Sequence, residues 1–299
     1  MRAFIVIAIV LLAAPAWAQG ARERLVASPS WLAKRLGEPG LVILQVGDRA
    51  AYEAGHIPGS RLVTAAELAA PTGGDALSLE LPDPAVLRAR LSALGVGDTS
   101  QIVVVPTREA GIQSATRVVF TLDTAGLGGR TRLLEGGAAA WAAEGRPLST
   151  QAPKPASPAR LSPIRYRSAV VDAEFVRRHA RAPGYRLVDA RLPEFYDGAR
   201  TGGSPERPHK TGHIAGAVNV PFNTVARSDL TLAPAAEIAA RFRAAGVKRG
   251  DTVIAYCHIG QQASATLFAA RTLGLKVKLY DGSFEEWSRL GGAVATGPR

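Results

Sequence analysis

An internal repeat constrains this chain more than any other feature. The segment Gly55-His56-Ile57-Pro58-Gly59 returns 157 residues later as Gly212-His213-Ile214-Ala215-Gly216. Three further landmarks recur in the same order. They are Gly-Asp-Thr at Gly97 and Gly250, Ser-Ala-Thr at Ser114 and Ser264, and an acidic residue with glycine ahead of a Trp at Glu135 and Asp281. The order is kept while the offset drifts to 146 residues, so the pattern predicts a duplicated domain with loops of different length.

Chain length and a Pro-rich segment locate the two copies. The chain has 299 residues, which is too long for one typical domain and suits two. Residues 146–165 contain five Pro and no long apolar run, so we expect an extended, solvated linker there. We place the domains at 22–149 and 165–296, with the linker over 150–164.

Each half alternates short apolar runs with amphipathic segments, which is typical of an α/β domain with a parallel sheet. The predicted buried strands are 41–44, 102–105, 186–188 and 252–256, and the clearest predicted helices are 235–245 and 263–273. The predicted fold is therefore two tandem α/β domains, each a mostly parallel sheet flanked by helices. Residues 198–211 occur only in the second half, and we expect them to form a polar, mobile insertion.

The N-terminus has the pattern of a secretory signal. Arg2 supplies a basic start, residues 4–14 form an apolar run, and Ala16-Trp17-Ala18 gives the small-x-small cleavage pattern. The run is too short to span a bilayer comfortably. We expect residues 1–18 to be removed by a cut after Ala18, which leaves an exported protein, periplasmic or otherwise, without stable membrane insertion; retention as an anchor is the alternative.

Composition excludes several classes of function. Apolar residues make up 47% of the chain, which excludes global disorder. The formal charge is +11, but the basic residues are scattered without long runs, so we expect attraction for small anions and no nucleic-acid binding. A single cysteine, Cys257, excludes an intramolecular disulfide framework and a multi-cysteine metal site, and we expect no metal and no cofactor.

Cys257 follows the predicted strand 252–256 and begins a loop that continues as His258-Ile259-Gly260-Gln261-Gln262. A strand-to-helix turn aims successive backbone N–H groups at one point, which favours a thiolate over a thiol. Gly260 permits the turn, and His258 adds a polar donor. The sequence therefore predicts a nucleophilic cysteine, with a buried structural cysteine as the alternative.

The equivalent loop of the first half, residues 106–111, contains no cysteine. Alignment on the Ser-Ala-Thr landmarks puts Thr107 opposite Cys257, whereas alignment on the glycines puts Arg108 there. In either case only one copy is chemically competent. An exported protein has little use for an unpaired thiol that does nothing, which also favours the nucleophile.

Four motifs of the second half together resemble a tandem-domain rhodanese of the thiosulfate and 3-mercaptopyruvate sulfurtransferase family. They are Leu187-Val188-Asp189-Ala190-Arg191, Gly212-His213-Ile214-Ala215-Gly216-Ala217 with Asn219 and Pro221, Tyr256-Cys257-x-x-Gly260, and Tyr280-Asp281-Gly282-Ser283 with Trp287. The resemblance implies an inactive N-terminal copy and a catalytic C-terminal copy. It also implies that the cysteine takes a sulfane sulfur from a small anionic donor, becomes a persulfide, and passes the sulfur to cyanide or a thiol. No protein partner is indicated.

The resemblance also suggests substrate-binding residues. Arg191 corresponds to a family position whose Arg binds the anionic end of the donor, and Asp189 is expected to orient the loop. The loop residues His258, Ile259, Gly260, Gln261 and Gln262 are expected to surround the donor. The repeated Gly-His-Ile motif favours a structural role for His56, although His56 is also a candidate for substrate contact across the cleft.

The loop departs from both family subtypes. Members that prefer thiosulfate usually carry basic residues after the cysteine, and members that prefer mercaptopyruvate carry Cys-Gly-Ser-Gly. Here His258 and Ile259 stand in those places, so mercaptopyruvate is the less expected donor. We expect His258 either to be cationic at mildly acidic pH and to attract a dianion, or to be a solvated loop residue.

Two other functions are weighed against this one. A cysteine phosphatase or arsenate reductase needs an Arg at the sixth place after the cysteine, where this chain has Ala263. An exported sulfur carrier or sensor would use the same cysteine without turning over a small donor. Steady production of thiocyanate distinguishes an enzyme from a carrier.

Overall fold

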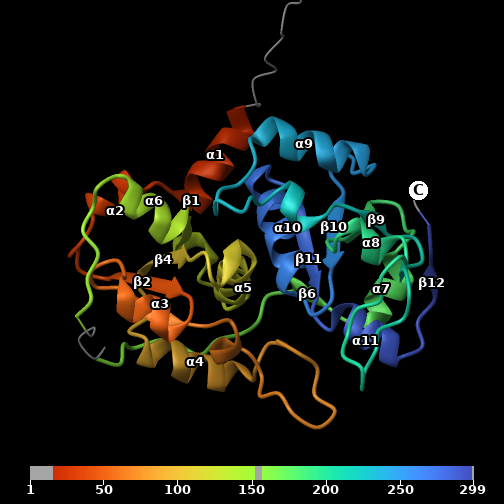
Figure 1. Cartoon of the computed structure of the whole chain (residues 1–299), viewed down its shortest axis with the longest axis horizontal. Helices are drawn as coiled ribbons and strands as arrows, with labels where there is room; N and C mark the ends of the chain where they lie inside the picture. The colour runs from red at the N-terminus through yellow and green to blue at the C-terminus, as the bar shows by residue number, and fades with distance from the viewer. Residues whose placement is uncertain (1–15, 152–156, 298–299) are drawn as a thin grey trace, which may run out of the picture.

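Two five-stranded sheets, each entirely parallel, form the framework of the molecule (Figure 1). The computed structural model describes residues 16–151 and 157–297. The first sheet has the order β1-β5-β4-β2-β3, with β1 (Val26–Ala27), β2 (Leu41–Val46), β3 (Arg61–Val63), β4 (Gln101–Pro106) and β5 (Thr131–Leu134). The second has the order β6-β11-β10-β7-β9, with β6 (Val170–Val171), β7 (Tyr185–Asp189), β9 (Val218–Asn219), β10 (Thr252–Tyr256) and β11 (Lys276–Tyr280). The predicted duplicated α/β fold is therefore confirmed, since both sheets share one strand order.

Helices cover both faces of each sheet. In the first half they are α1 (Ala16–Leu25), α2 (Pro29–Ala33), α3 (Arg49–Ala54), α4 (Pro84–Ala93), α5 (Gly111–Thr124) and α6 (Gly137–Ala143), with short 3₁₀ turns η1 (Ala66–Leu68) and η2 (Gly128–Arg130). In the second half they are α7 (Ala173–His179), α8 (Pro193–Tyr196), α9 (Ala235–Ala244), α10 (Gln261–Thr272) and α11 (Ser283–Arg289), with the turn η3 (Phe222–Thr224). A small antiparallel pair, β8 (His213–Ile214) with β12 (Val294–Ala295), closes the C-terminal end.

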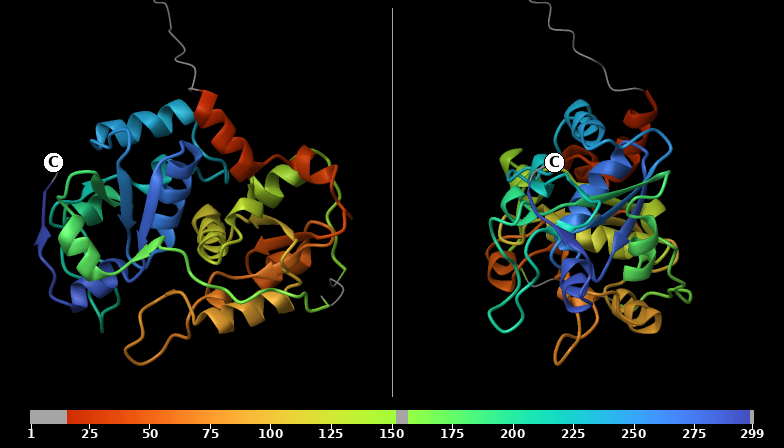
Figure 2. Two further views of the ribbon diagram at one scale, coloured as in Figure 1. Left: turned by 180° about the vertical axis from the view of Figure 1, so that it is seen from behind. Right: turned by 90° about the vertical axis from the view of Figure 1, so that its right-hand side faces the viewer.

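The two halves share one hydrophobic core. Successive residues of a strand point to opposite faces of its sheet, so Val253 faces the junction between the halves while Ile254 faces a core of its own half. The core at the junction joins the inner faces of both sheets through α5 and α10, which lie side by side between them (Figure 2). Most of α5 is buried, from Ile112 to Thr124. The active and inactive copies are thus packed as one body around this helix pair.

Sheet register decides which residue of the first half stands opposite Cys257. Tyr256, the last residue of β10, pairs with Asp189, and Pro106, the last residue of β4, pairs with Val46. Since β10 and β4 are equivalent strands, Thr107 occupies the position of Cys257. Both loops have four residues before their helix, but the glycine of the first loop, Gly111, comes one position later than Gly260, which is why the glycine landmarks point to Arg108 instead.

Two segments that were expected to be irregular make contacts with the domains. The linker is not fully solvated, because Leu161 and Ile164 are buried in the shared core. The insertion at 198–211 packs back on itself and on the end of the second half. An isolated β-bridge joins Gly203 to Pro208, and the Lys210 ammonium donates to the Gly292 carbonyl at 2.8 Å.

The predicted signal segment, residues 1–18, lies largely outside the described residues, the first of which is Ala16. Helix α1 starts there and continues past the predicted cut after Ala18. Further along α1, Arg22 joins the two halves by pairing with Glu135 at 2.5 Å and donating to the Ala233 carbonyl at 3.0 Å. In the part of the chain that the structure describes, no helix is long and apolar enough to cross a membrane.

Candidate active site

Cys257 lies directly after β10, at the carboxyl edge of the second sheet, and its side chain is fully buried. Hydrogen bonds from the backbone amides of Ala263, Ile259 and Gln262 converge on the thiol. Burial nevertheless raises the pKa of the Cys257 thiol, and the three amides oppose that rise without cancelling it. The predicted amide cradle is therefore present, but it does not by itself lower the thiol pKa.

The start of α11 holds the other side of the loop. The Cys257 amide donates to Ser283 Oγ at 3.3 Å, and the Phe284 amide donates to the Cys257 carbonyl at 3.0 Å. The Glu285 amide continues the pattern by donating to the His258 carbonyl at 3.0 Å. These bonds fix the backbone on both sides of the sulfur, as a site for an anionic intermediate requires.

Gly260 turns the chain from this loop into α10. Its φ of 80° lies in the left-handed region, which a residue with a Cβ adopts only with strain. The helix begins at Gln261, two residues before the predicted start, because the left-handed residue serves as the N-cap. The amides of Gln262 and Ala263 are then free of the helix ladder and face the thiol.

Arg191 is buried beside the loop and is paired with Asp189. Its Nη2 lies 2.5 Å from Asp189 Oδ2 and 2.7 Å from the Gly212 carbonyl oxygen, and its guanidinium carbon lies 3.9 Å from the centre of the Phe284 ring. Burial disfavours the cation, but Asp189 outweighs it and raises the pKa of Arg191; Cys257 contributes in the same direction. Arg191 therefore lies within electrostatic range of the sulfur, and its charge is balanced by Asp189.

His258 matches neither alternative that the sequence left open, because its ring is half-buried rather than solvated and is not a cation. Its ring meets Phe195 edge-on at 4.6 Å and lies 5.6 Å from the ring of His209. Burial, followed by the charge of Arg191, lowers the pKa of His258 to about 4. The ring is therefore neutral at mildly acidic and neutral pH, so the expectation of an imidazolium that attracts a dianion is wrong.

The insertion at 198–211 covers this histidine. A Cβ built on Gly202 would lie 2.6 Å from His258 Nδ1 and 3.3 Å from His209 Nδ1, so only a glycine fits closely there. Arg207 extends the cover to the first half by pairing with Asp75 at 3.3 Å. Sequence reasoning missed Gly202, His209 and Phe195; the restriction of the insertion to the catalytic copy was the available signal.

Two other predicted site residues have different roles. His56 is buried in the first half, where it stacks on Tyr52 at 4.0 Å and its Nδ1 lies 2.8 Å from the Tyr52 carbonyl oxygen. His213 makes the same contacts with Tyr196, which accounts for the repeated motif as a structural turn. His56 as a substrate contact is thus contradicted. The side chain of Gln261, which was expected to surround the donor, donates from Nε2 to Ser114 Oγ of the first half at 2.7 Å.

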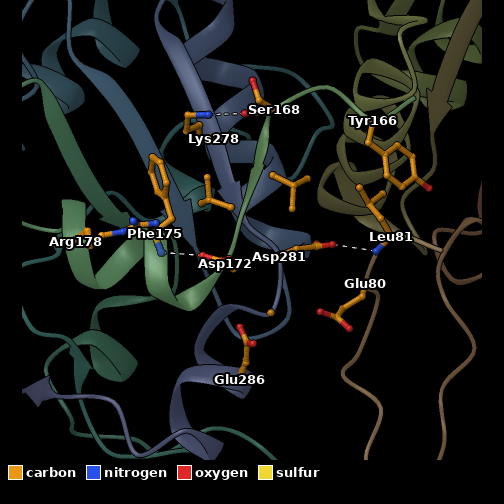
Figure 3. Close-up of a pocket in the computed structure, with 13 residues that line it drawn as sticks. Glu80, Leu81, Tyr166, Ser168, Asp172, Phe175, Arg178, Lys278, Asp281 and Glu286 are labelled. Atoms are coloured by element: carbon orange, nitrogen blue, oxygen red, sulfur yellow. Dashed lines mark hydrogen bonds between the residues drawn. The ribbon is translucent and has the colours of Figure 1, made fainter. Parts of the chain in front are cut away.

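A cavity of about 600 Å³ is lined by residues of both halves (Figure 3), and none of residues 257–262 is part of its wall. Its wall includes Glu80 and Leu81 from the first half and Asp281 and Glu286 from the second. Within 16–151 and 157–297, no three His, Cys, Asp or Glu side chains gather as a metal site would need.

Comparison with known proteins assigns both halves of the chain to one domain family. The model of the Rhodanese-like domain matches residues 28–144 and 172–290. The chain is 30% identical over 289 residues to a thiosulfate sulfurtransferase of Corynebacterium glutamicum, covering 92% of this chain and 91% of the relative. It is also 30% identical over 287 residues to the sulfur carrier protein TtuD of Thermus thermophilus, covering 91% and 96%. Among solved structures, the 3-mercaptopyruvate sulfotransferase SseA of Escherichia coli matches with a TM-score of 0.74 and 26% identity, covering 86% of this chain and 98% of that one.

Proposed function

Because this chain belongs to the rhodanese family and is a sulfurtransferase, we propose that Cys257 carries a sulfane sulfur from a small anionic donor to a thiophilic acceptor. One observation carries this assignment. The two repeats place a loop at the same sheet edge, and only the second has a nucleophile there, surrounded by three backbone amides.

The proposed reaction has two balanced steps. The Cys257 thiolate attacks the outer sulfur of thiosulfate, the S–S bond of the donor breaks, and sulfite leaves with the bonding electron pair. Cyanide then attacks the outer sulfur of the enzyme persulfide, which releases thiocyanate and regenerates the thiolate. The amides of Ile259, Gln262 and Ala263 would stabilise the anionic sulfur in both steps.

Thiosulfate or a similar donor is the proposed substrate class. The name of the Corynebacterium relative supports thiosulfate, and the place where mercaptopyruvate-preferring members have a Ser is Ile259 here. Arg191 is the proposed donor-binding cation. With His258 neutral and Ile259 apolar, the loop adds no second cation, so we expect weak binding of a dianionic donor.

Replacement of the cysteine tests the proposal. Cys257→Ser should abolish thiocyanate formation, because a hydroxyl cannot carry sulfur as a persulfide. Thr107→Ser is the matched control, since it changes the equivalent position of the inactive copy and should leave the rate unchanged. Mass spectrometry after thiosulfate treatment should find one added sulfur on the Cys257 peptide that cyanide removes. Near wild-type activity in Cys257→Ser would overturn the mechanism.

A sulfur carrier is the second candidate, favoured by the name of the Thermus relative. A carrier would load Cys257 once and discharge only to a protein acceptor. Steady thiocyanate release over many turnovers supports the enzyme, whereas loading of one sulfur on Cys257 without thiocyanate release supports the carrier.

We also propose that the mature protein is exported after a cut behind Ala18. The support is the sequence pattern of residues 1–18. Sequencing of the N-terminus of the protein from a periplasmic fraction should give Gln19 first. An intact Met1 in a membrane fraction would indicate a retained anchor instead.

A further inference from the structure

A buried arginine of the inactive half reaches the catalytic half. Arg117 lies in the middle of α5 and is 2% exposed. Its Nη1 lies 2.6 Å from Asp281 Oδ1, and its Nη2 donates to the Leu79 carbonyl. The second oxygen of Asp281 accepts the Leu81 amide at 2.9 Å, so the carboxylate is held entirely by the first half (Figure 3).

This ion pair touches the turn of the catalytic loop. A Cβ built on Gly260 would lie 2.7 Å from Arg117 Nη1, 3.2 Å from the Asp281 carbonyl oxygen and 3.3 Å from its Oδ1. Gly260 lies between Ile259 on one side and Gln262 and Ala263 on the other. The amides of these three residues converge on the thiol. The pair therefore lies directly against the backbone that shapes the amide cradle.

A second contact from the same helix holds the residue that follows. Gln261 Nε2 donates to Ser114 Oγ at 2.7 Å. Ser114 and Arg117 are three residues apart on α5 and share one helix face. Two side chains of the inactive half thus contact two consecutive residues of the catalytic loop.

The repeat itself shows that this contact is asymmetric. Aligned on the Ser-Ala-Thr landmarks, Arg117 of the first copy stands opposite Leu267 of the second. Buried arginines are rare unless they are paired, and a buried ion pair contributes little net stability compared with apolar side chains of similar size. Arg117 belongs to the copy that lacks a nucleophile, yet its charge lies against the loop that contains Cys257. Packing alone does not explain this placement.

We propose that Arg117 is a positioning residue for sulfur transfer: together with Asp281 it holds the backbone at Gly260 so that the amides on either side converge on Cys257. The proposal rests on the assignment of Cys257 as the sulfur carrier. The domain without a nucleophile then completes the catalytic site of its neighbour.

Two arginine variants test this role, with persulfide loading from thiosulfate and discharge to cyanide measured separately by rapid quench. Arg117→Lys keeps a cation in nearly the same volume. The lysine ammonium cannot hydrogen-bond to the Asp281 carboxylate and the Leu79 carbonyl in the geometry of the guanidinium. Both steps should slow at least about tenfold and by similar factors, because both use the loop amides and a misplacement of about 1 Å can cost roughly a hundredfold. KM for thiosulfate should change little, since Arg117 does not contact the donor.

A paired neutral variant separates positioning from stability. Arg117→Met alone leaves the buried Asp281 carboxylate uncompensated, whereas Arg117→Met with Asp281→Asn removes both charges. The double variant should regain thermal stability relative to Arg117→Met but remain slow in both steps. Recovery of both stability and rate would overturn the proposal, because it would show that charge balance alone was needed.

The chain offers a matched control on the same helix pair. Asp123 of α5 pairs with Arg271 of α10 at 3.1 Å, near the far end of both helices from the loop. Asp123→Asn breaks a contact between the halves without touching Gly260, so sulfur transfer should stay at the wild-type rate. An equal loss in Asp123→Asn, or wild-type rates in Arg117→Lys, would overturn the proposal. Failure of the wild-type protein to load sulfur on Cys257 would instead overturn the proposed function.

Discussion

Asp189 and Arg191 form a buried, forked ion pair at the end of β7. Arg191 Nε lies 3.0 Å and 3.1 Å from the two carboxylate oxygens, and neither side chain is more than 1% exposed. Asn219 adds hydrogen bonds of 2.9 Å to the backbone carbonyls of both residues. The net charge of the pair is zero. These bonds hold the Arg191 guanidinium in one position beside the catalytic loop.

Arg191→Ala should therefore cause two losses. The variant leaves the buried Asp189 carboxylate unpaired, which costs roughly 3–5 kcal/mol of unfolding free energy. It also removes the proposed donor contact, so kcat/KM for thiosulfate should fall at least about tenfold. Denaturant unfolding and steady-state kinetics measure the two effects separately.

Arg49→Ala provides the matched comparison for Arg191. The side chain of Arg49 is 79% exposed and pairs with Glu53, one helical turn away. Neither stability nor sulfur transfer should change measurably. A greater loss of activity in Arg49→Ala than in Arg191→Ala would show that the anion pocket is assigned to the wrong half.

Cys257 should alkylate slowly at neutral pH in the folded protein. The thiol is fully buried and its pKa is raised, and only the thiolate reacts. The rate with iodoacetamide should keep rising with pH beyond the ordinary thiol value of about 8.5. The unfolded protein, whose thiol is exposed, is the reference; an equally fast reaction of the folded protein at pH 7 would contradict the burial.

His258 should make the protein less stable in mild acid. Its folded pKa of about 4 lies below the ordinary value of 6.5, so between these values the unfolded chain binds a proton that the folded chain excludes. Unfolding free energy should therefore fall as the pH drops from about 6.5 toward 4. His258→Gln should reduce this pH dependence in urea titrations at pH 7 and pH 5.

The neutral His258 also has a consequence for activity. Between pH 6 and pH 8 the pH–rate profiles of wild type and His258→Gln should be parallel, because the ring does not titrate there. A titration near 6.5 that is present in wild type and lost in His258→Gln would show that the histidine is solvated during turnover. His209, whose pKa is also lowered by burial, should be replaced in a parallel variant to separate the two rings.

Gly202→Ala should disturb the cover over the catalytic loop. The added methyl group would lie 2.6 Å from the His258 ring, so either the insertion or the loop must shift. Sulfur transfer should fall several-fold, with little change in melting temperature because residues 198–211 contribute little to the core. Gly129→Ala is the control, since its methyl group would meet no atom within 4 Å. An active Gly202→Ala would show that the cover is not required.

The sequence alone determined the duplicated fold and the place of the nucleophile. Strand 252–256 was predicted with its observed bounds, and Cys257 follows it directly as expected. These features depend on local pattern, because a β-branched apolar run followed by a glycine-containing turn dictates a buried strand and a loop at its end. Repetition of the same landmarks in one chain then indicated two copies without any knowledge of their contacts.

Only the tertiary structure decided what surrounds the sulfur. Register between strands chose Thr107 over Arg108 as the counterpart of Cys257, and packing made His258 neutral and decided for the structural role of His56 over substrate contact. Arg117 reaches Asp281 across a separation of 164 residues. Burial, pKa and hydrogen-bond partners depend on groups brought together from distant parts of the chain, and short-range sequence patterns contain no information about those distances.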